Sequence, residues 1–541
     1  MHQNFSASAY WPGGFSQGDR SIDRFWVLGF LLAALFLFTT GLGDPPLRDW
    51  DEGTIAQVAR EIWRSAPGTQ TWLFPTLAGS PYLNKPPLMH LIIAAAYNMG
   101  GVNEWTTRLP GALLTACSVP LLYCIGREVF VQRLPAILAT SVYLTLLPLV
   151  RHGRLAMLDG AAICFFLVMV LCLLRSRRHP GWTLGLGIGF GLICLTKGAL
   201  GLLLGAIALS FLAWDTPRLL TSGYLWLGLL LGSLPVAAWY AAQWLHYGKA
   251  FFETHIIDQS FSRIWQSVES HREPVWYYLL EILKYNWPWL LFYGQGLQTA
   301  WQNRNLNWSK LVLVWSGGYL LVVSLMGTKL PWYILPIYPA LALAAGVQLT
   351  QLWYYPTQQL YPKFWRIIFT LLAGIGFGGS LYFGKFSPDM DLELCLILGS
   401  VGVTMMLAAI LVALQDRQFL TILLWGSYIS LTLLMTSQHW IWELAEAYPV
   451  KPVAAMVKQA TPPGTLIYTS YPHVRPSLNF YSDRQVIPES SEALNNRWQQ
   501  DLDPYLLIDE NTLPALQLEQ VEVIAEARDW QLIKHQRSTG N

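Results

Sequence analysis

Residues 392–414 read LELCLILGSVGVTMMLAAILVAL, a run of 23 residues in which Glu393 is the only charged side chain. A helix needs about 20 mostly apolar residues to cross the hydrocarbon core of a bilayer, so this stretch predicts a transmembrane helix. The same composition extends along most of the chain. Of the 541 residues, 53% are hydrophobic and 13% are charged, whereas a soluble domain has about 25% charged residues. The sequence therefore predicts an all-α polytopic membrane protein.

Working outward from this run, we expect about thirteen transmembrane helices. The first apolar run follows Arg20 and Arg24 and has no small-residue cleavage pattern after it, so it is interpreted as a retained helix rather than a signal peptide. The expected spans are residues 25–43, 107–126, 134–150, 159–175, 181–197, 198–214, 221–244, 275–298, 309–327, 331–350, 365–384, 392–414 and 418–437.

Basic residues in the short loops predict the orientation, because cytoplasmic loops carry an excess of Lys and Arg. The clearest cluster is Arg175-Ser-Arg177-Arg178-His179 between the fourth and fifth spans, and Arg20 and Arg24 agree with it by parity. We expect a multi-pass protein of the plasma (inner) membrane with a cytoplasmic N-terminus. No basic tract indicates a nucleic-acid partner.

Three longer polar segments then lie on the outer face. Strand-like stretches in the last of them predict a small extracytoplasmic α/β domain behind a transmembrane domain of residues 1–437. The outer loops are residues 44–106 and 245–274, the C-terminal domain is 438–541, and its strand-like stretches are 465–469 and 505–508.

The first outer loop contains Asp51-Glu52 directly before an apolar stripe at helical spacing. Ile55, Val58 and Ile62 belong to that stripe, which predicts an amphipathic helix along the membrane surface. Asp51 at the start of this helix has two interpretations. It is a catalytic carboxylate, or it is an N-cap, a position that favours Asp.

The same loop ends in Asn84-Lys85-Pro86-Pro87-Leu88. Pro suits the first turn of a helix, so Lys85 is expected at a helix N-terminus. A lysine combined with a helix N-terminus suits a phosphate. The alternative is a lysine that extends its ammonium group to the membrane interface.

Further charged residues fall on the outer face under the same topology. Asp159 is expected at the start of the fourth span, where a carboxylate is functional or is paired with Arg151 or Arg154. A lone His on a loop is more often structural than catalytic. The remaining outer candidates are Lys197, Arg263, Glu269, His271 and Lys329.

This collection of carboxylates and cations suits one kind of reaction. A carboxylate removes a proton from an acceptor, and cations stabilise an anionic phosphate leaving group. A transporter is the alternative from another class, but it would carry charges at mid-bilayer depth in broken helices. A purely structural membrane protein leaves the charged outer face unexplained.

Several ordered blocks resemble the GT-C membrane glycosyltransferases, in particular the lipid A aminoarabinose transferase and protein O-mannosyltransferase (PMT-like) group. Asp51-Glu52 is similar to the first-loop motif of that group. The other similar blocks are Lys85-Pro86-Pro87-Leu88, Arg108-Leu109-Pro110, Arg154 through Asp159, Leu195 through Gly198, Glu269 through Tyr278 and Lys329 through Pro336. The resemblance covers about residues 25–350.

The resemblance implies an inverting glycosyltransferase that moves a sugar from a polyprenyl-phosphate carrier to a lipid, glycan or protein acceptor on the outer face of the membrane. It implies that Asp51 is the base, with Glu52 beside it, and that Asp159 is a second important acid. Lys85 would contact the carrier phosphate, helped by Arg263 and Tyr333. Lys197 and Lys329 are further candidates for binding that phosphate.

Some assignments stay open at this point. An oligosaccharide or polymer ligase of similar fold would use the same face, and the sugar, acceptor and carrier length are not specified. Partners are the polyprenyl-phosphate-linked sugar donor, an unknown acceptor and membrane lipids. No cofactor is assigned. A divalent metal ion remains an alternative, although Asn84 stands where aminoarabinose transferases often carry an acidic residue.

Overall fold

The structure is a computed structural model that describes residues 17–266, 273–354, 361–442, 450–501, 503–516 and 518–536. The chain forms two compact units. Unit 1 comprises Met1–Leu42, Leu83–Met89 and Leu109–Ile441, and unit 2 comprises Gly43–Tyr82, His90–Arg108 and Trp442–Asn541.

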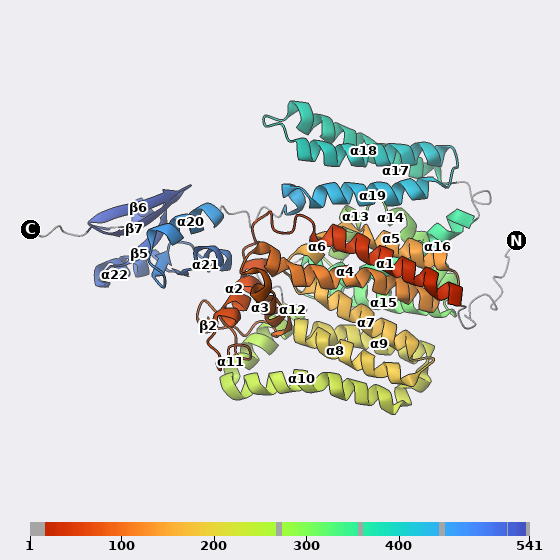
Figure 1. Cartoon of the computed structure of the whole chain (residues 1–541), viewed down its shortest axis with the longest axis horizontal. Helices are drawn as coiled ribbons and strands as arrows, with labels where there is room; N and C mark the ends of the chain where they lie inside the picture. The colour runs from red at the N-terminus through yellow and green to blue at the C-terminus, as the bar shows by residue number, and fades with distance from the viewer. Residues whose placement is uncertain are drawn as a thin grey trace, which may run out of the picture. The chain divides into compact units, whose positions relative to one another are not determined.

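Unit 1 is a bundle of helices that run largely side by side (Figure 1). Its elements are α1 (Gln17–Thr39), α5 (Arg133–Leu144), α6 (Leu147–Arg154), α7 (Asp159–Arg175), α8 (Thr183–Lys197), α9 (Leu200–Asp215), α10 (Gly223–Tyr247), α11 (Lys249–Phe251), the π-helix η4 (Phe252–Phe261), α12 (Ser262–Trp265), α13 (Tyr277–Tyr285), α14 (Leu290–Gln302), α15 (Asn307–Leu325), η5 (Pro331–Ile337), α16 (Tyr338–Tyr354), α17 (Lys363–Leu381), η6 (Tyr382–Phe386), α18 (Leu392–Ala413) and α19 (Phe419–Met435). The chain passes between the units within α3 (Leu88–Gly100) and α4 (Glu104–Val129).

The apolar helices make the chain a multi-pass membrane protein. Within the described residues, seven helices are long and apolar enough to cross a bilayer, or eight if α5 and α6 form one span. Other expected spans coincide with shorter helices, such as α7 with 17 residues and α8 with 15. The prediction of thirteen crossings is therefore not settled by helix length.

Two predicted spans are each interrupted. The expected span 134–150 is divided into α5 and α6, which meet at an angle of 57°. The expected span 275–298 is divided into α13 and α14. Proline explains both breaks, because it lacks a backbone N–H and clashes with the preceding turn. Pro148 stands in the first turn of α6, and Pro288 lies between α13 and α14.

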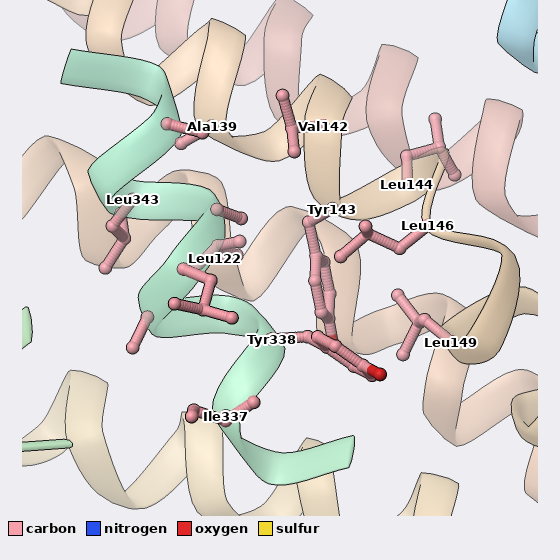
Figure 2. Close-up of a cluster of buried hydrophobic side chains, with 14 of the residues drawn as sticks. Leu122, Ala139, Val142, Tyr143, Leu144, Leu146, Leu149, Ile337, Tyr338 and Leu343 are labelled. Carbon is pink, nitrogen blue, oxygen red and sulfur yellow. The ribbon is translucent and has the colours of Figure 1, made fainter. Parts of the chain in front are cut away.

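The centre of unit 1 is a continuous apolar core. Figure 2 shows Leu122 of α4, Val142 and Tyr143 of α5, and Tyr338 and Leu343 of α16 within it. Each of these side chains is at most 1% exposed. The core fixes α4, α5 and α16 against one another and leaves their ends to carry the polar groups.

Glycines let α8 and α10 approach to backbone contact. A Cβ built on Gly187 or Gly191 of α8 would collide with the backbone of Gly228 or Gly232 of α10. Glycines four residues apart on both helices are typical of close packing between membrane helices, where van der Waals contact stabilises the pair.

Ion pairs gather several helix ends on one side of unit 1. Arg175, at the end of α7, donates to Glu128 near the end of α4 at 3.1 Å. Arg177 binds Asp215 at the end of α9 at 2.8 Å, and Lys310 in the first turn of α15 lies 3.7 Å from the same carboxylate. The arginine cluster predicted to be cytoplasmic thus shares one end of the bundle with Lys310.

Unit 2 contains a five-stranded sheet with strand order β4-β3-β5-β7-β6. β3 pairs in parallel with β4 and β5, and β7 pairs antiparallel with β5 and β6. The described elements are α2 (Asp51–Arg64), β1 (Thr76–Leu77), β2 (Ser80–Pro81), α20 (Val450–Ala460), β3 (Leu466–Thr469), α21 (Pro476–Ser482), β4 (Gln485–Pro488), α22 (Ser491–Gln500), β5 (Tyr505–Asp509), β6 (Val521–Ala527) and β7 (Trp530–His535).

Alternating side chains give this sheet two apolar faces, as expected for a strand of period two. Leu507 of β5 packs with α20 and α21, whereas Leu506 and Ile508 pack with Trp498 of α22. The strands predicted at 465–469 and 505–508 are confirmed as β3 and β5. The C-terminal part of the chain is therefore a three-layer α/β fold.

The amphipathic helix predicted after Asp51 is confirmed as α2, and its apolar stripe is buried. Part of its surface is covered by protein. A Cβ on Gly53 would lie 2.7 Å from the backbone nitrogen of Ser477 in α21. Arg60 lies off the apolar stripe but is buried against α21. Its guanidinium group donates to the carbonyl oxygens of Asn479 and Phe480, which compensates for the loss of water. α2 is thus anchored to the C-terminal fold.

Candidate functional site

An ion pair joins the start of α7 to the end of α8 in unit 1. Asp159 is the first residue of α7, and Lys197 is in the last turn of α8. Lys197 Nζ lies 2.5 Å from Asp159 Oδ1, and both side chains are largely buried. Gly198 ends α8 with φ +54°, a conformation that favours glycine. The carboxylate expected in this position therefore has as its partner a lysine from the end of a different helix, α8.

The two arginines suggested as partners for Asp159 bind backbone carbonyls. Arg154 is fully buried and donates to the carbonyl oxygens of Leu37 in α1 and Met435 in α19. Its guanidinium also lies 4.6 Å from the ring centroid of Trp440, whose carbonyl accepts from Arg151. These contacts tie α6 to α1 and α19.

Lys85 is held by a segment that lies far from it in the sequence. Its Nζ donates to Gln259 Oε1 of η4 at 3.1 Å. One turn earlier in η4, His255 Nδ1 lies 2.9 Å from the carbonyl oxygen of Leu83, and His255 Nε2 lies 2.9 Å from the hydroxyl of Tyr240. Because a carbonyl only accepts, the Nδ1 atom carries the proton and Nε2 accepts from Tyr240. η4 therefore holds residues 83–85 in place through the contacts of His255 and Gln259.

The expected helix start at Lys85 is wrong. α3 begins at Leu88, three residues later. A residue that precedes proline is disfavoured in helical conformation, and Pro86 and Pro87 stand in succession, so the helix cannot begin at Lys85. The lysine acts from the loop through its own charge rather than together with a helix N-terminus.

Two further predicted residues form a pair beside the Asp159–Lys197 ion pair. Arg263 Nη1 donates to the hydroxyl of Tyr333 at 3.0 Å. The Tyr333 ring lies 5.2 Å from Lys197 Nζ, within cation–π range. Arg263 Nε is buried and has no hydrogen-bond partner among the described residues. The Nε–H group of Arg263 can therefore donate a hydrogen bond to a ligand oxygen.

The charges of this group act on Lys85. Burial, followed by the positive charges of Arg263 and Lys197, lowers the pKa of Lys85 to about 7, and Asp159 opposes the shift. Burial also lowers the pKa of His255 to about 4, so its imidazole is neutral at pH 7. We call Lys85, Asp159, Lys197, Arg263 and Tyr333 the cationic cluster. Its excess of positive charge suits an anion.

Lys329 makes a different kind of contact. Its Nζ donates to the carbonyl oxygen of Met326 at 2.5 Å, directly after α15. Burial lowers the pKa of Lys329, and Glu273 opposes this. Lys329 is buried, with 4% of its surface exposed. Because its ammonium group binds a carbonyl that follows α15, it stabilises the end of that helix.

Asp51 and Glu52 lie in unit 2 and have different surroundings. Asp51 is the first residue of α2, and the N-cap position belongs to Trp50, which excludes the N-cap interpretation. Asp51 is 3.1 Å from Arg48, with 22% of its side chain exposed. Glu52 is fully buried and accepts from Arg108 Nε at 2.8 Å and Nη2 at 2.7 Å.

The Glu52–Arg108 pair organises the loop before α2. Arg108 also donates to the carbonyl oxygens of Pro45 and Pro46, at 2.8 and 2.9 Å. Glu52 Oε2 accepts from the backbone nitrogen of Arg48 at 3.0 Å. A bidentate arginine–carboxylate pair of this kind fixes direction as well as distance. It therefore orients the segment that carries Arg48 and Asp51.

Glu269 and His271 lie outside the described residues. In the part of the chain that the structure describes, no group of three or more His, Cys, Asp or Glu side chains is placed to hold a metal ion. Asn84 offers an amide rather than a carboxylate next to Lys85. The described residues thus do not form a metal centre built on a carboxylate next to Lys85.

Sequence reasoning missed His255, Gln259 and Tyr240. His255 and Gln259 contact the loop around Lys85, and Tyr240 acts through His255. A lone His in a polar segment carries no sequence signal for that role. Gln259 is four residues after His255, a helical spacing, and this was the single available sign that both face the same side.

We expect removal of one member of the Glu52–Arg108 pair to destabilise the protein. Glu52→Ala leaves a buried arginine unpaired, a change that costs about 3–5 kcal/mol. Thermal unfolding of the purified protein in detergent should show a lower midpoint. The double variant Glu52→Leu/Arg108→Met should recover part of the loss, since neither charge remains. Equal stability of Glu52→Ala and wild type would contradict the structural role.

Comparison with known proteins supports the fold and the resemblance to this group of enzymes. Residues 84–241 match the family model described as dolichyl-phosphate-mannose-protein mannosyltransferase. The chain is 31% identical over 342 residues to an undecaprenyl phosphate-alpha-4-amino-4-deoxy-L-arabinose arabinosyl transferase of Pseudomonas fluorescens, and this match spans 60% of each chain. It is 30% identical to the enzyme of the same name from Erwinia tasmaniensis over 54% of each.

The fold agrees over almost the whole chain. ArnT from Cupriavidus metallidurans, solved with undecaprenyl phosphate bound, superposes with a TM-score of 0.77 at 19% identity, covering 94% of this chain and 98% of that one. The oligosaccharyltransferase of Archaeoglobus fulgidus gives a TM-score of 0.53 at 12% identity, covering 91% and 70%. The resemblance of this chain to the GT-C membrane glycosyltransferases of the aminoarabinose transferase and protein O-mannosyltransferase group is thereby confirmed.

Proposed function

We propose that this chain is an inverting glycosyltransferase that moves a sugar from a polyprenyl-phosphate carrier to an acceptor on the outer face of the plasma (inner) membrane. The observation that carries the proposal is the cationic cluster, in which Lys85, Lys197 and Arg263 meet one carboxylate, Asp159. The matched relatives are named for transfer from undecaprenyl phosphate. Mass spectrometry of envelope glycolipids and glycoproteins, with and without the protein, tests the proposal and identifies the product.

The cluster suits the phosphate of the carrier. Lys85 and the open donor of Arg263 would bind its oxygens, and Tyr333 orients Arg263. Lys197 is neutralised by Asp159 and contributes through the Tyr333 ring. As the bond between the anomeric carbon and the phosphate oxygen breaks, negative charge grows on the phosphate. Fixed cations stabilise that charge more in the transition state than in the ground state.

Asp51 is proposed as the general base. It removes the proton from the acceptor hydroxyl, whose oxygen forms the new bond to the anomeric carbon on the face opposite the phosphate. The carrier leaves as polyprenyl phosphate, and the configuration inverts. The ion pair with Arg48, at 3.1 Å, orients the Asp51 carboxylate. Asp159, as the second acid, supports the cluster through Lys197.

The other candidates receive supporting roles. Glu52 positions the loop of Asp51 through Arg108, Arg154 ties helices together, and Lys329 stabilises the end of α15. Glu269 and His271 remain candidates from their motif alone.

The identity of the sugar and of the acceptor stays open within this proposal. Aminoarabinose is the sugar named for the matched relatives, and Asn84 weakens its assignment here because an acidic residue often precedes the lysine in those enzymes. An oligosaccharide ligase is the second candidate. The fold similarity to the archaeal oligosaccharyltransferase favours it over a transporter.

We expect Lys85→Ala to weaken polyprenyl-phosphate binding by about 1.5–3 kcal/mol, roughly ten- to hundredfold. With a pKa of about 7, Lys85 of the free protein loses its proton as the pH rises, so affinity should fall above pH 7. Binding should draw a proton onto Lys85 at pH 8. Calorimetric titrations in two buffers of different ionisation enthalpy measure this uptake.

The matched control for Lys85 is Lys249→Ala, which removes an exposed lysine of the same unit. Lys85→Arg should restore part of the affinity and abolish proton uptake, because a guanidinium stays protonated. If Lys85→Ala binds the carrier as wild type does, Lys85 is an interfacial lysine and the phosphate role is wrong.

We expect Asp51→Asn to lower the transfer rate by about 10²–10⁴-fold while carrier binding is unchanged, because the amide cannot accept the acceptor proton. Single-turnover assays with a radiolabelled polyprenyl-phosphate sugar separate transfer from binding. Asp44→Asn alters an exposed carboxylate of the same loop and should retain activity. Wild-type turnover by Asp51→Asn would refute the base assignment.

We expect the C-terminal α/β domain to be extracytoplasmic and the N-terminus cytoplasmic, with thirteen crossings between them. Arg177 and Lys310 both pair with Asp215, so their loops lie at the same end of the helix bundle. This supports placing both loops on the same side of the membrane. Alkaline phosphatase fused after Gln438 should be active, and a fluorescent protein fused after Arg178 should fluoresce. The opposite pattern would overturn the topology.

A further inference from the structure

A polar cavity of about 180 Å³ lies within unit 2, apart from the cationic cluster of unit 1. Three elements form its walls: the second half of α2, the tip of the β1–β2 hairpin, and the segment from α21 into β4. A water molecule occupies about 30 Å³ of liquid, so the cavity has room for a group considerably larger than water.

The walls are tied to one another by polar contacts. Glu61 of α2 accepts from the hydroxyl of Thr76 and from the backbone nitrogen of Ala78, at 2.5 and 2.7 Å. Gln485 of β4 donates to the carbonyl oxygen of Ala78 at 2.6 Å. Ala78 has φ +52°, a strained conformation that these contacts maintain. The hairpin tip is therefore held in place between α2 and the sheet.

The charged groups of the cavity largely satisfy each other. Arg60 and Arg64, one turn apart on α2, both bind Asp483. Arg60 donates its remaining bonds to the carbonyl oxygens of Asn479 and Phe480, at 3.2 and 2.7 Å. Glu61 is occupied by the hairpin. These commitments leave the site without a strong preference for a charged ligand.

Two lining residues each retain one buried polar atom that lacks a partner among the described residues: Gln57 Oε1 and Asn479 Nδ2. Their amide orientations follow from chemistry. Gln57 presents its NH₂ to the Glu61 carboxylate at 2.8 Å, and Asn479 presents its oxygen to the backbone N–H of Val486 at 3.2 Å. Asn479 is 1% exposed. A buried polar group without a partner costs about 1–3 kcal/mol, so both atoms favour a ligand.

The pair of open atoms selects the ligand chemistry. Gln57 Oε1 needs a donor, and Asn479 Nδ2 needs an acceptor. An ionised phosphate or carboxylate only accepts, and an ammonium group only donates, whereas a hydroxyl does both. We propose that this cavity binds an uncharged, hydroxylated sugar residue of the acceptor. Its hydroxyls would donate to Gln57 and accept from Asn479.

The position on α2 distinguishes this sugar from the one that is transferred. Gln57 follows Asp51 by six residues, about 9 Å along a helix that rises 1.5 Å per residue. The cavity therefore suits a further residue of a glycan acceptor, bound at a distance from the reacting hydroxyl. Sugar binding itself stands on the cavity, and its role as an acceptor subsite rests on the proposed function.

Saturation-transfer NMR on the full-length protein tests the proposal. The protein is held in nanodiscs free of sugar-based detergent and titrated with a panel of neutral pentoses, hexoses and N-acetylhexosamines. At least one sugar should bind. Gln57→Leu and Asn479→Asp should each weaken that binding by about tenfold or more, the equivalent of one hydrogen bond. Asn479→Asp keeps the oxygen that accepts from Val486 and replaces the NH₂ donor with a second, acceptor-only oxygen.

Gln531→Leu is the matched control. Gln531 donates to Glu526 at 3.0 Å and has a buried Oε1 without a partner among the described residues, but it does not line the cavity. This variant should bind the sugar as wild type does. Binding of no sugar in the panel, or equal binding by Gln57→Leu, would overturn the proposal and leave ordered water as the occupant.

A second comparison separates this proposal from the proposed function. Lys85→Ala should lose carrier affinity and retain sugar binding, because Lys85 belongs to the cationic cluster of unit 1. Sugar binding in a protein that transfers no sugar would preserve the cavity and reject the glycosyltransferase. Transfer to a glycan acceptor that is equally efficient in wild type and Gln57→Leu would reject the acceptor subsite.

Discussion

A charge buried among apolar helices must be compensated, and this constraint explains the polar architecture of both units. Leaving one charge of a buried pair without its partner costs several kcal/mol. Asp159 and Lys197 meet this requirement between α7 and α8, and Glu52 and Arg108 meet it in unit 2. The charge of Arg154 is compensated by backbone carbonyl oxygens and by the ring of Trp440. Each compensation ties together segments that are distant in the sequence.

The cationic cluster uses the same constraint for a different purpose. Lys197 is neutralised, but Lys85 and Arg263 are held by neutral groups, Gln259 and Tyr333. A neutral partner positions a cation without cancelling its charge. The resulting positive potential lowers the pKa of Lys85 to about 7 and suits an incoming phosphate. Repulsion between these positive charges raises the free energy of the cluster when no anion is bound. Binding of a phosphate would relieve that repulsion.

Sequence reasoning identified residue types better than partners. It selected Asp159, Lys197, Arg263 and Tyr333 from ordered motifs, and the structure brings these four together. It suggested Arg151 or Arg154 as the partner of Asp159, because those residues are near in the chain. The structure supplies Lys197 instead, since helix packing brings the end of α8 to the start of α7.

The sequence by itself determined the membrane class, most helix positions, the strands at 465–469 and 505–508, and the motif residues. These features follow from local composition and periodicity, which need no knowledge of distant contacts. Tertiary structure alone decided which charges pair, that Glu52 is buried, that His255 supports the loop of Lys85, and that α2 is anchored to α21. Partner choice depends on which helix ends meet, and packing of the whole chain sets that geometry.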